Sequence, residues 1–351
     1  MKRIFIAMIV TLMGLAVVPV GAQDEPLRVV TYDSFSVSED VLNAFTEETG
    51  ITVEILPVAD AGAMVNQAVL TKDNPLGDVL YGIDNTFLSR GLNGGIFEPY
   101  ESPALENIPE EFLLDPEFNV TSVAYGDVCL NYDATYFEEN ELAIPESLED
   151  LTLPDYKGLL VVENPATSSP GLAFLMATIA YFESDEDEET TWQAFWADLV
   201  ENDVLAVEGW TQAYYGEFSG ASEDGTRPLV VSYASSPPAE VYFAEPQPET
   251  APTGSVVGDG MCFRQIEFAG ILAGTANRDA AEQFIDFLLG TAFQEDLPLQ
   301  MFVFPVNPEA ELPAVFEEFA AVPENPARID AADIEANRED WIQAWTEIVL
   351  R

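Results

Sequence analysis

The feature that most constrains the fold is a regular alternation of short β-branched runs with amphipathic helical segments. Leu27–Tyr32 is typical of a strand, and Ser38–Glu48 is typical of an amphipathic helix that ends at Gly50, where a C-cap glycine belongs. The alternation continues with a strand, a helix and a strand at Ile51–Leu56, Gly62–Leu70 and Asp78–Gly82. This order predicts an α/β fold whose mostly parallel sheets are flanked by helices, with ligands bound beyond the carboxyl ends of the strands.

Two long strands, Val123–Leu130 and Gly260–Phe268, bracket a further α/β block. A block enclosed in this way indicates one lobe inserted into another, so that two chain crossings form a hinge beside a cleft. The length also favours two lobes over one. We therefore expect lobe 1 at 23–126 plus 263–306, the inserted lobe 2 at 127–262, and C-terminal helices at 307–351 that pack on lobe 2.

The first 22 residues have the pattern of a secretory signal. Lys2 and Arg3 precede the apolar run Ile4–Val18, which is short for a membrane span, and Val20–Ala22 supplies small residues for cleavage. We expect cleavage near Ala22 and a mature protein in the periplasm or outside the cell.

The charge balance is strongly acidic. Loss of the signal lowers the basic count from 12 to 10 against 63 acidic residues, so the formal net charge becomes −53. This balance excludes a nucleic-acid partner, because phosphate contacts need a basic face. It is typical of a solvated surface and also attracts cationic ligands. With 48% apolar residues the chain is nevertheless a folded protein with a large core.

Histidine is absent, and only two cysteines are present, Cys129 and Cys262. The lack of histidine excludes Ser-His-Asp and Cys-His catalysis and most transition-metal sites, so we expect neither an enzyme nor a bound metal. In an oxidising compartment the two cysteines more often pair than stay free. We expect a disulfide that joins the two long strands; the alternative is two separately buried thiols.

Polar and aromatic residues gather where the predicted strands end. Tyr32–Phe35 closes the first strand and Gly82–Asn85 the third, while Asn164–Gly171 and Ser232–Pro237 follow strands of the inserted block. Serines before a helix are first of all N-caps, and helix N-termini also bind anions. For Ser168 and Ser169, capping and ligand binding therefore both remain open.

The aromatic stretch EGWTQAYYGEF allows two interpretations. Trp210, Tyr214 and Phe218 recur at four-residue steps, which is the spacing of a helix face in a core. Gly209 indicates a turn that places Trp210 at a helix entrance near the cleft, where its ring could stack on a flat cation. Asp84 across the cleft would complete the charge match.

Six motifs in register resemble the thiamine-binding periplasmic proteins of ABC transporters, within the wider family of two-lobed solute-binding proteins. They are TYDSF, GDVLYGIDN, NPATSSPGL, GWTQAY, VVSYASSP and FVFPV, and they run in order from Leu27 to Arg351. The resemblance implies a two-lobed periplasmic-binding-protein fold with a mixed sheet in each lobe and two hinge crossings. It also implies that a monomer without a cofactor carries thiamine or a thiamine phosphate to an ABC permease and its ATPase.

The resemblance also assigns a ligand site, motif by motif. Aromatic rings would flank the pyrimidine, an acidic residue would lie near the amine or the thiazolium, and serines would take the hydroxyethyl or phosphate end. The residues at these positions are Tyr32, Asp84, Ser168, Ser169, Trp210, Tyr214, Tyr233, Ser235 and Phe302. Phe302 stands where the family has a tryptophan; it can still stack on a ring but has no N–H to donate.

Other functions remain in competition with this one. A polyamine carrier of the same fold would use several carboxylates between aromatic walls, and an iron carrier commonly uses paired tyrosines, which Tyr214 and Tyr215 superficially fit. A secreted hydrolase with two catalytic carboxylates is a further alternative. No motif places two carboxylates on facing strand ends, so we rank it last.

Overall fold

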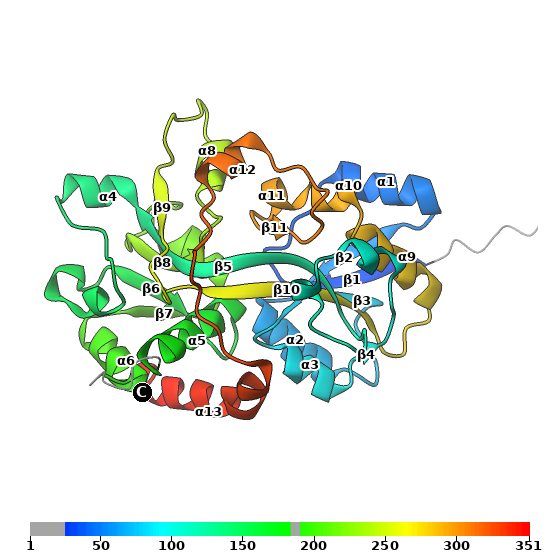
Figure 1. Cartoon of the computed structure of the whole chain (residues 1–351), viewed down its shortest axis with the longest axis horizontal. Coiled ribbons are helices and arrows are strands. Elements are labelled where there is room, and N and C mark those ends of the chain that lie inside the picture. Colours follow the sequence, from blue (N-terminus) through cyan, green and yellow to red (C-terminus); the bar gives the residue numbers. More distant parts are fainter. Residues whose placement is uncertain (1–24, 184–189) are drawn as a thin grey trace, which may run out of the picture.

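A computed structural model describes residues 25–183 and 190–351 (Figure 1). The expected signal segment, Met1–Ala22, lies outside the described residues. The strands are β1 (Leu27–Thr31), β2 (Val53–Pro57), β3 (Val79–Asp84), β4 (Phe97–Glu98), β5 (Thr121–Asp133), β6 (Leu160–Glu163), β7 (Leu205–Val207), β8 (Leu229–Tyr233), β9 (Thr253–Val256), β10 (Phe263–Leu272) and β11 (Phe304–Pro305).

Helices flank these strands and vary widely in length. They are α1 (Glu39–Thr49), α2 (Ala61–Leu70), α3 (Leu88–Gly94), α4 (Ala134–Glu139), α5 (Ser169–Glu183), α6 (Trp192–Glu201), α7 (Trp210–Gln212), the π-helical turn η5 (Ala213–Glu217), α8 (Pro238–Tyr242), α9 (Arg278–Leu288), α10 (Thr291–Gln294), α11 (Leu297–Gln300), α12 (Ala314–Phe319) and α13 (Ala331–Val349). Within the described ranges, none of them combines the length and the apolarity that a membrane crossing needs.

The described strands form one continuous mixed sheet in the order β2-β1-β3-β10-β5-β8-β6-β7. The outer strands are parallel within each half, β1 with β2 and β3, and β6 with β7 and β8. The central strands β5 and β10 are antiparallel to each other and to their outer neighbours. The predicted α/β class is therefore confirmed, with antiparallel strands where the two halves join.

Two lobes lie at opposite ends of β5 and β10 (Figure 1). We call the elements β1–β3 and α1–α3 with α9–α11 the N-terminal lobe, and β6–β9 with α4–α8 the central lobe. The strands β5 and β10 run through both lobes and pair from Phe263 with Val128 to Ala269 with Thr121. Their ladder shifts register between Glu267 and Phe268, so the pairing is irregular toward the end of the ladder at Ala269.

Local chemistry explains the helix ends that the sequence predicts. Helix α1 begins after Ser38, whose hydroxyl accepts from the Val41 N–H, and ends at Gly50 with φ of 76°. A left-handed φ of this kind is adopted at low cost only by glycine. In the central lobe, α5 is buried along nearly all of its length, because its own side chains are apolar on every face of the helix.

The C-terminal helix α13 packs on both lobes. Trp345 is fully buried and meets Trp196 of α6 edge to face, with 5.5 Å between ring centroids. Toward its N-terminal half, Arg338 donates to Ser89 of α3 and lies over the Phe87 ring. The expectation placed this helix on lobe 2; it reaches α3 of the N-terminal lobe as well.

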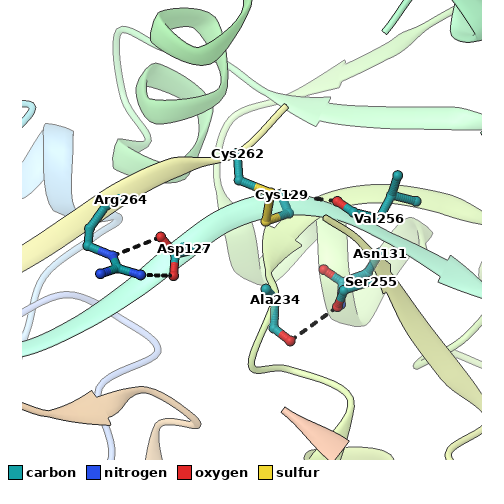
Figure 2. The surroundings of a disulfide bond; sticks show 8 residues. All are labelled: Asp127, Cys129, Asn131, Ala234, Ser255, Val256, Cys262 and Arg264. Carbon is teal, nitrogen blue, oxygen red and sulfur yellow. Dashed lines mark hydrogen bonds and ion pairs between the residues drawn. A yellow bond between two sulfur atoms is a disulfide. The ribbon is translucent and has the colours of Figure 1, made fainter. Parts of the chain in front are cut away.

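A disulfide joins the two crossing strands (Figure 2). Cys129 of β5 bonds Cys262, which directly precedes β10, and both cysteines are fully buried. Two residues along each strand, the Arg264 guanidinium binds both carboxylate oxygens of Asp127 at 2.9 and 2.8 Å. The predicted pairing is confirmed, and the alternative of two buried thiols is wrong. The covalent bond and the ion pair hold β5 and β10 together on the side of the central lobe.

Candidate functional site

A cavity of about 320 Å³ lies between the two lobes, beside the crossing strands. Its size is that of a pocket for a small organic ligand. Both lobes and the crossing strands contribute to its wall. The polar, charged and aromatic side chains of the wall are Tyr32, Asp33, Ser34, Asp60, Asp84, Tyr125, Ser169, Trp210, Thr211, Tyr214, Tyr215, Tyr233, Ser236, Gln265, Glu267, Gln300 and Phe302.

A pair of stacked rings forms the wall on the central lobe. Trp210 and Tyr214 are nearly parallel, with 4.8 Å between centroids and 17° between planes. The Trp210 indole N–H donates to Ser232 Oγ at 2.9 Å, which fixes the rotation of the ring. Tyr214 is buried behind Trp210, whereas Trp210 is partly exposed to the cleft. The indole thus offers a fixed flat face, which is suited to stacking on a planar or cationic group.

The local fold differs from the continuous helix that the four-residue spacing suggests. Trp210 is the first residue of the short helix α7. The five residues after α7 form the π-helical turn η5, which holds Tyr214 under Trp210. Phe218 lies beyond the turn in the core of the central lobe. Both interpretations of the stretch are therefore partly correct: Tyr214 and Phe218 pack in the core, and Trp210 reaches the cavity.

Asp60 connects the lobes across the cavity. It precedes α2 of the N-terminal lobe, and its carboxylate accepts from the backbone N–H of Trp210 at 2.8 Å and of Ser169 at 3.3 Å. Gly209 makes this approach possible, because a Cβ there would lie 3.0 Å from Asp60 Oδ2. Burial raises the pKa of Asp60 to about 6, and the hydrogen bond from Trp210 lowers it only in part.

Asp84 belongs to a network centred on Gln265. One Asp84 oxygen accepts from the Thr86 N–H and hydroxyl, and the other accepts from Gln265 Nε2 at 2.8 Å. The same Gln265 amide donates to Ser169 Oγ at 3.0 Å, and its oxygen accepts from the Tyr233 hydroxyl at 2.6 Å. Asp84 is 2% exposed. Its oxygens are thus largely committed to protein donors, and its main effect on the cleft is through its charge and through the position of Gln265.

Glu267 is a further carboxylate of the cavity wall, and its hydrogen-bond partners are the phenol groups of Tyr32 and Tyr81. It follows Gln265 by two residues on β10, so both side chains point to the same face of the strand. Burial raises the pKa of Glu267 to about 7, the phenol groups of Tyr32 and Tyr81 lower it in part, and the charge of Asp84 raises it further. A carboxylate held in this way gains most from a cation that enters the cavity.

No basic side chain balances these acids. Within residues 25–183 and 190–351, no Lys or Arg lines the cavity. Arg264 is adjacent to Gln265 in sequence, but successive side chains of a strand alternate between faces, and Asp127 already neutralises it. Three cavity-lining carboxyl groups thus have no cation nearby: Asp84, which is buried, and Asp60 and Glu267, which are partly buried. Such a site disfavours an anion and favours a ligand that carries positive charge.

The structure brings together most residues that the sequence singled out. Seven of them line the same cavity: Tyr32, Asp84, Ser169, Trp210, Tyr214, Tyr233 and Phe302. Ser168 and Ser235 lie outside this wall, and both are fully buried. Ser168 caps the start of α5, where its Oγ accepts from the Gly171 N–H at 3.5 Å. Ser236, the residue after Ser235, lines the cavity instead.

The wall residues that the sequence did not single out include Asp60, Gln265 and Glu267. Asp60 follows the end of β2, as Tyr32 follows the end of β1, so its position beyond a strand end is a sequence signal for the cavity. Gln265 and Glu267 lie on either side of Ile266 on a largely buried strand, and Phe268 follows them. Polar residues at every second position of a largely apolar strand indicate that one face of the strand lines a polar cavity or contacts solvent.

The arrangement can hold a flat cation but offers little for chemistry or metal binding. The side chains that converge are rings, hydroxyls, an amide and carboxylates. Among the described residues, no group of three or more His, Cys, Asp or Glu is placed to hold a metal ion. The fold and the cavity together define a two-lobed binding protein with a site for a small molecule between the lobes.

Comparison with known proteins identifies the family. The family model of the bacterial extracellular solute-binding proteins matches residues 74–326, and the chain belongs to that family. Its relatives and structural neighbours are binding proteins rather than enzymes, and proteins of this family work with ABC transporters.

Individual relatives narrow the comparison. The thiamine-binding periplasmic protein of Escherichia coli (strain K12) is 27% identical over 331 residues, which cover 93% of this chain and 94% of that protein. A solved periplasmic thiamin binding protein superposes with a TM-score of 0.78 and 25% identity over 93% of this chain and 96% of its own. A ferric binding protein from Campylobacter jejuni shares the fold, with a TM-score of 0.69 and 20% identity over 92% and 99% of the two chains.

Proposed function

We propose that this protein captures thiamine, or one of its phosphate esters, in the cavity between the lobes and delivers it to an ABC permease. The observation that carries the proposal is the pairing of a fixed indole face at Trp210 with cavity carboxylates that have no cationic partner in the cavity wall. Thiamine is planar in both of its rings and carries a permanent positive charge on the thiazolium. Its charge and shape therefore match the two properties of the cavity.

Each part of the cavity has a role in this proposal. Trp210, Tyr32 and Tyr233 supply ring faces that stack on the pyrimidine and the thiazolium. Glu267 supplies the negative group that the cation approaches, and Ser169 and Ser236 supply hydroxyls for the hydroxyethyl end. Phe302 closes one corner with an apolar ring.

Delivery requires no change to the ligand. The relatives named above are periplasmic, which supports an extracytoplasmic location and agrees with the expected signal segment. In this proposal the loaded, closed protein docks on the permease, and opening of the lobes there releases the vitamin. The hinge strands β5 and β10 would carry that motion.

A polyamine is the second candidate, because several buried carboxylates without a basic partner would also suit a ligand with several amines. Ferric iron fits the geometry less well. The Tyr214 hydroxyl donates to Glu240 at 2.8 Å, and the rings of Tyr214 and Tyr215 stand at 84° to each other. The two adjacent tyrosines therefore do not form a free pair of phenols aimed at one ion.

One calorimetric series separates these ligands. The purified protein is titrated with thiamine, spermidine and ferric citrate at pH 7.5, and each experiment is repeated with Trp210→Ala. We expect tight binding of thiamine that the substitution weakens by at least about ten-fold, since a desolvated cation–π contact contributes about 2 kcal/mol and the ring also buries apolar area. Heat with spermidine alone would transfer the proposal to polyamines, and heat with ferric citrate alone would transfer it to iron.

A further inference from the structure

A carboxylate that does not line the cavity lies directly behind the stacked rings. Glu240 of α8 accepts from the Tyr214 hydroxyl through Oε1 at 2.8 Å and from Thr253 Oγ1 through Oε2 at 3.1 Å. It is partly buried, and no Lys or Arg of the described chain pairs with it. The Glu240 carboxylate, held from β9 by Thr253, is thus an unneutralised negative charge that accepts the hydrogen bond of the Tyr214 phenol.

The contacts form a continuous path from Glu240 to the cavity. Tyr214 is 1% exposed, and one face of its ring covers the Trp210 indole at a centroid distance of 4.8 Å. Trp210 in turn presents its ring to the cavity. A change of charge on Glu240 therefore acts on a ring pair whose geometry is fixed by stacking and by the hydrogen bond from Trp210 to Ser232.

The physical effect of this contact has a definite sign. A phenol that donates its proton to a carboxylate gains electron density in its ring, and the carboxylate adds a negative potential from behind. Both changes make a ring stack more attractive to a cation, because cation–π attraction depends on the negative potential over the ring face. Neither change strengthens the stacking of an uncharged ligand to the same degree.

We propose that Glu240 is a positioning residue that fixes Tyr214 beneath Trp210 and, by its charge, strengthens the attraction of the ring stack for a cationic ligand. This inference rests on the proposed function, because it presumes that a cation binds at Trp210. It assigns a role to a residue that lies outside the cavity wall.

The neutral pH range is where this role can be measured. Burial raises the pKa of Glu240 to about 7, while the hydrogen bonds from Tyr214 and Thr253 lower it in part. The titratable groups that face Glu240 are Tyr214 and Tyr215 of η5, and burial raises the pKa of both, so they stay uncharged. Thr253 of β9 does not titrate. Glu240 is therefore the group in this cluster whose charge changes between pH 6 and pH 8.

The test compares the wild type with Glu240→Gln, which keeps an acceptor for the Tyr214 hydroxyl but carries no charge. Thiamine affinity is measured by calorimetry from pH 5.5 to 8.5, with the exposed Glu249→Gln as the matched control. The ratio of the Kd values of E240Q and wild type is expected to be near 1 at pH 5.5 and to rise to about five at pH 8.5. The E249Q ratio is expected to stay near 1 throughout. Protonation of thiamine or of Glu267 affects all three proteins and cancels in the ratio.

A ratio that is independent of pH would overturn the inference, because a merely structural residue would weaken binding equally at every pH. If E240Q does not fold, Tyr214→Phe keeps the ring and removes the donor; a pH-dependent ratio supports the inference and a constant one refutes it. If the wild type binds no thiamine, the proposed function is wrong, and the same ratio measured with spermidine decides the role of Glu240 separately.

Discussion

Replacing Glu267 by Gln is expected to stabilise the ligand-free protein at neutral pH while weakening its affinity for a cation. The reason is that the carboxylate is buried in the cavity wall, where ionisation is unfavourable. Glutamine has nearly the same shape and can still accept hydrogen bonds from the neighbouring phenols. The substitution therefore removes a charge and leaves most of the packing unchanged.

The magnitude follows from the pKa of Glu267, which burial raises from an ordinary 4.5 to about 7. A pKa difference of one corresponds to about 1.4 kcal/mol, so the full effect is about 3 kcal/mol. Because the pKa is higher in the folded protein, this contribution is present below pH 4.5. It is lost as the pH rises through 7. We expect E267Q and wild type to be equally stable at pH 4.5 and E267Q to unfold about 4 °C higher at pH 7.5.

Differential scanning calorimetry of the ligand-free proteins at pH 4.5, 6.0 and 7.5 measures this difference. The exposed Glu249→Gln serves as the control and is expected to follow the wild type at each pH. Thiamine at 100 times its Kd should add about 2.7 kcal/mol to the stability of the wild type and less to that of E267Q at the same concentration. An E267Q variant that is less stable than wild type at pH 7.5, or whose difference does not change with pH, would refute the reasoning.

Three further predictions concern the rings, the protons and the disulfide. Trp210→Ala should abolish the quenching of protein fluorescence by thiamine, and residual quenching of wild-type size would place the ligand elsewhere. Thiamine affinity should fall about ten-fold from pH 7.5 to pH 5, because the raised pKa values of Asp60 and Glu267 leave these groups protonated at the lower pH and a cation must then displace the protons. Calorimetry in buffers of different ionisation enthalpy measures the number of protons released on binding, and a number that does not change with pH would contradict this prediction. Cys129 and Cys262 are 133 residues apart, so the disulfide closes a long loop in the unfolded chain. Replacing both by Ser should lower the free energy of unfolding, measured in urea, by about 5 kcal/mol. An unchanged unfolding midpoint would show that the disulfide does not stabilise the fold.

The sequence predicts the architecture well where local chemistry decides it. Gly50 takes the left-handed φ that a C-cap requires, and alternating strands and helices lead to the mixed sheet. The pairing of Cys129 with Cys262 could be predicted because they are the two cysteines of the sequence and an oxidising compartment favours a disulfide. The antiparallel direction of these strands and the packing of α13 on α3 depend on long-range contacts, which no local pattern specifies.

The sequence predicts most residues of the cavity wall but not which acidic residue is free to contact a ligand. Strand ends and aromatic spacing lead to Tyr32, Trp210 and Tyr233, since ligands of open α/β folds bind beyond strand ends. Sequence alone does not show that Thr86 and Gln265 occupy the oxygens of Asp84, so the choice of acidic contact depended on the tertiary network.

The serines illustrate the same limit at one-residue resolution. Ser235 and Ser236 are adjacent and chemically identical, yet only Ser236 lines the cavity. The turn that follows β8 decides which hydroxyl faces the ligand, and its geometry is not encoded in the residue types alone. Ser168 and Ser169 divide in the same way, with Ser168 at the start of α5 and Ser169 in the wall.

The buried carboxylates suggest why such a protein would accept a cost in stability. Burial raises the pKa of both Asp60 and Glu267, so the charged form of each is unfavourable in the cavity. A cation that enters the cavity removes that cost. The ligand would then favour the closed state by relieving the carboxylates, which couples lobe closure to loading.

The most direct measurement is a crystal structure of the protein with thiamine bound. The account predicts one thiamine between the lobes, with a ring of the vitamin stacked on Trp210 and its positive charge facing Glu267. A structure in which thiamine lies outside this cavity, or in which Trp210 and Glu267 both remain without contact to it, would contradict the account.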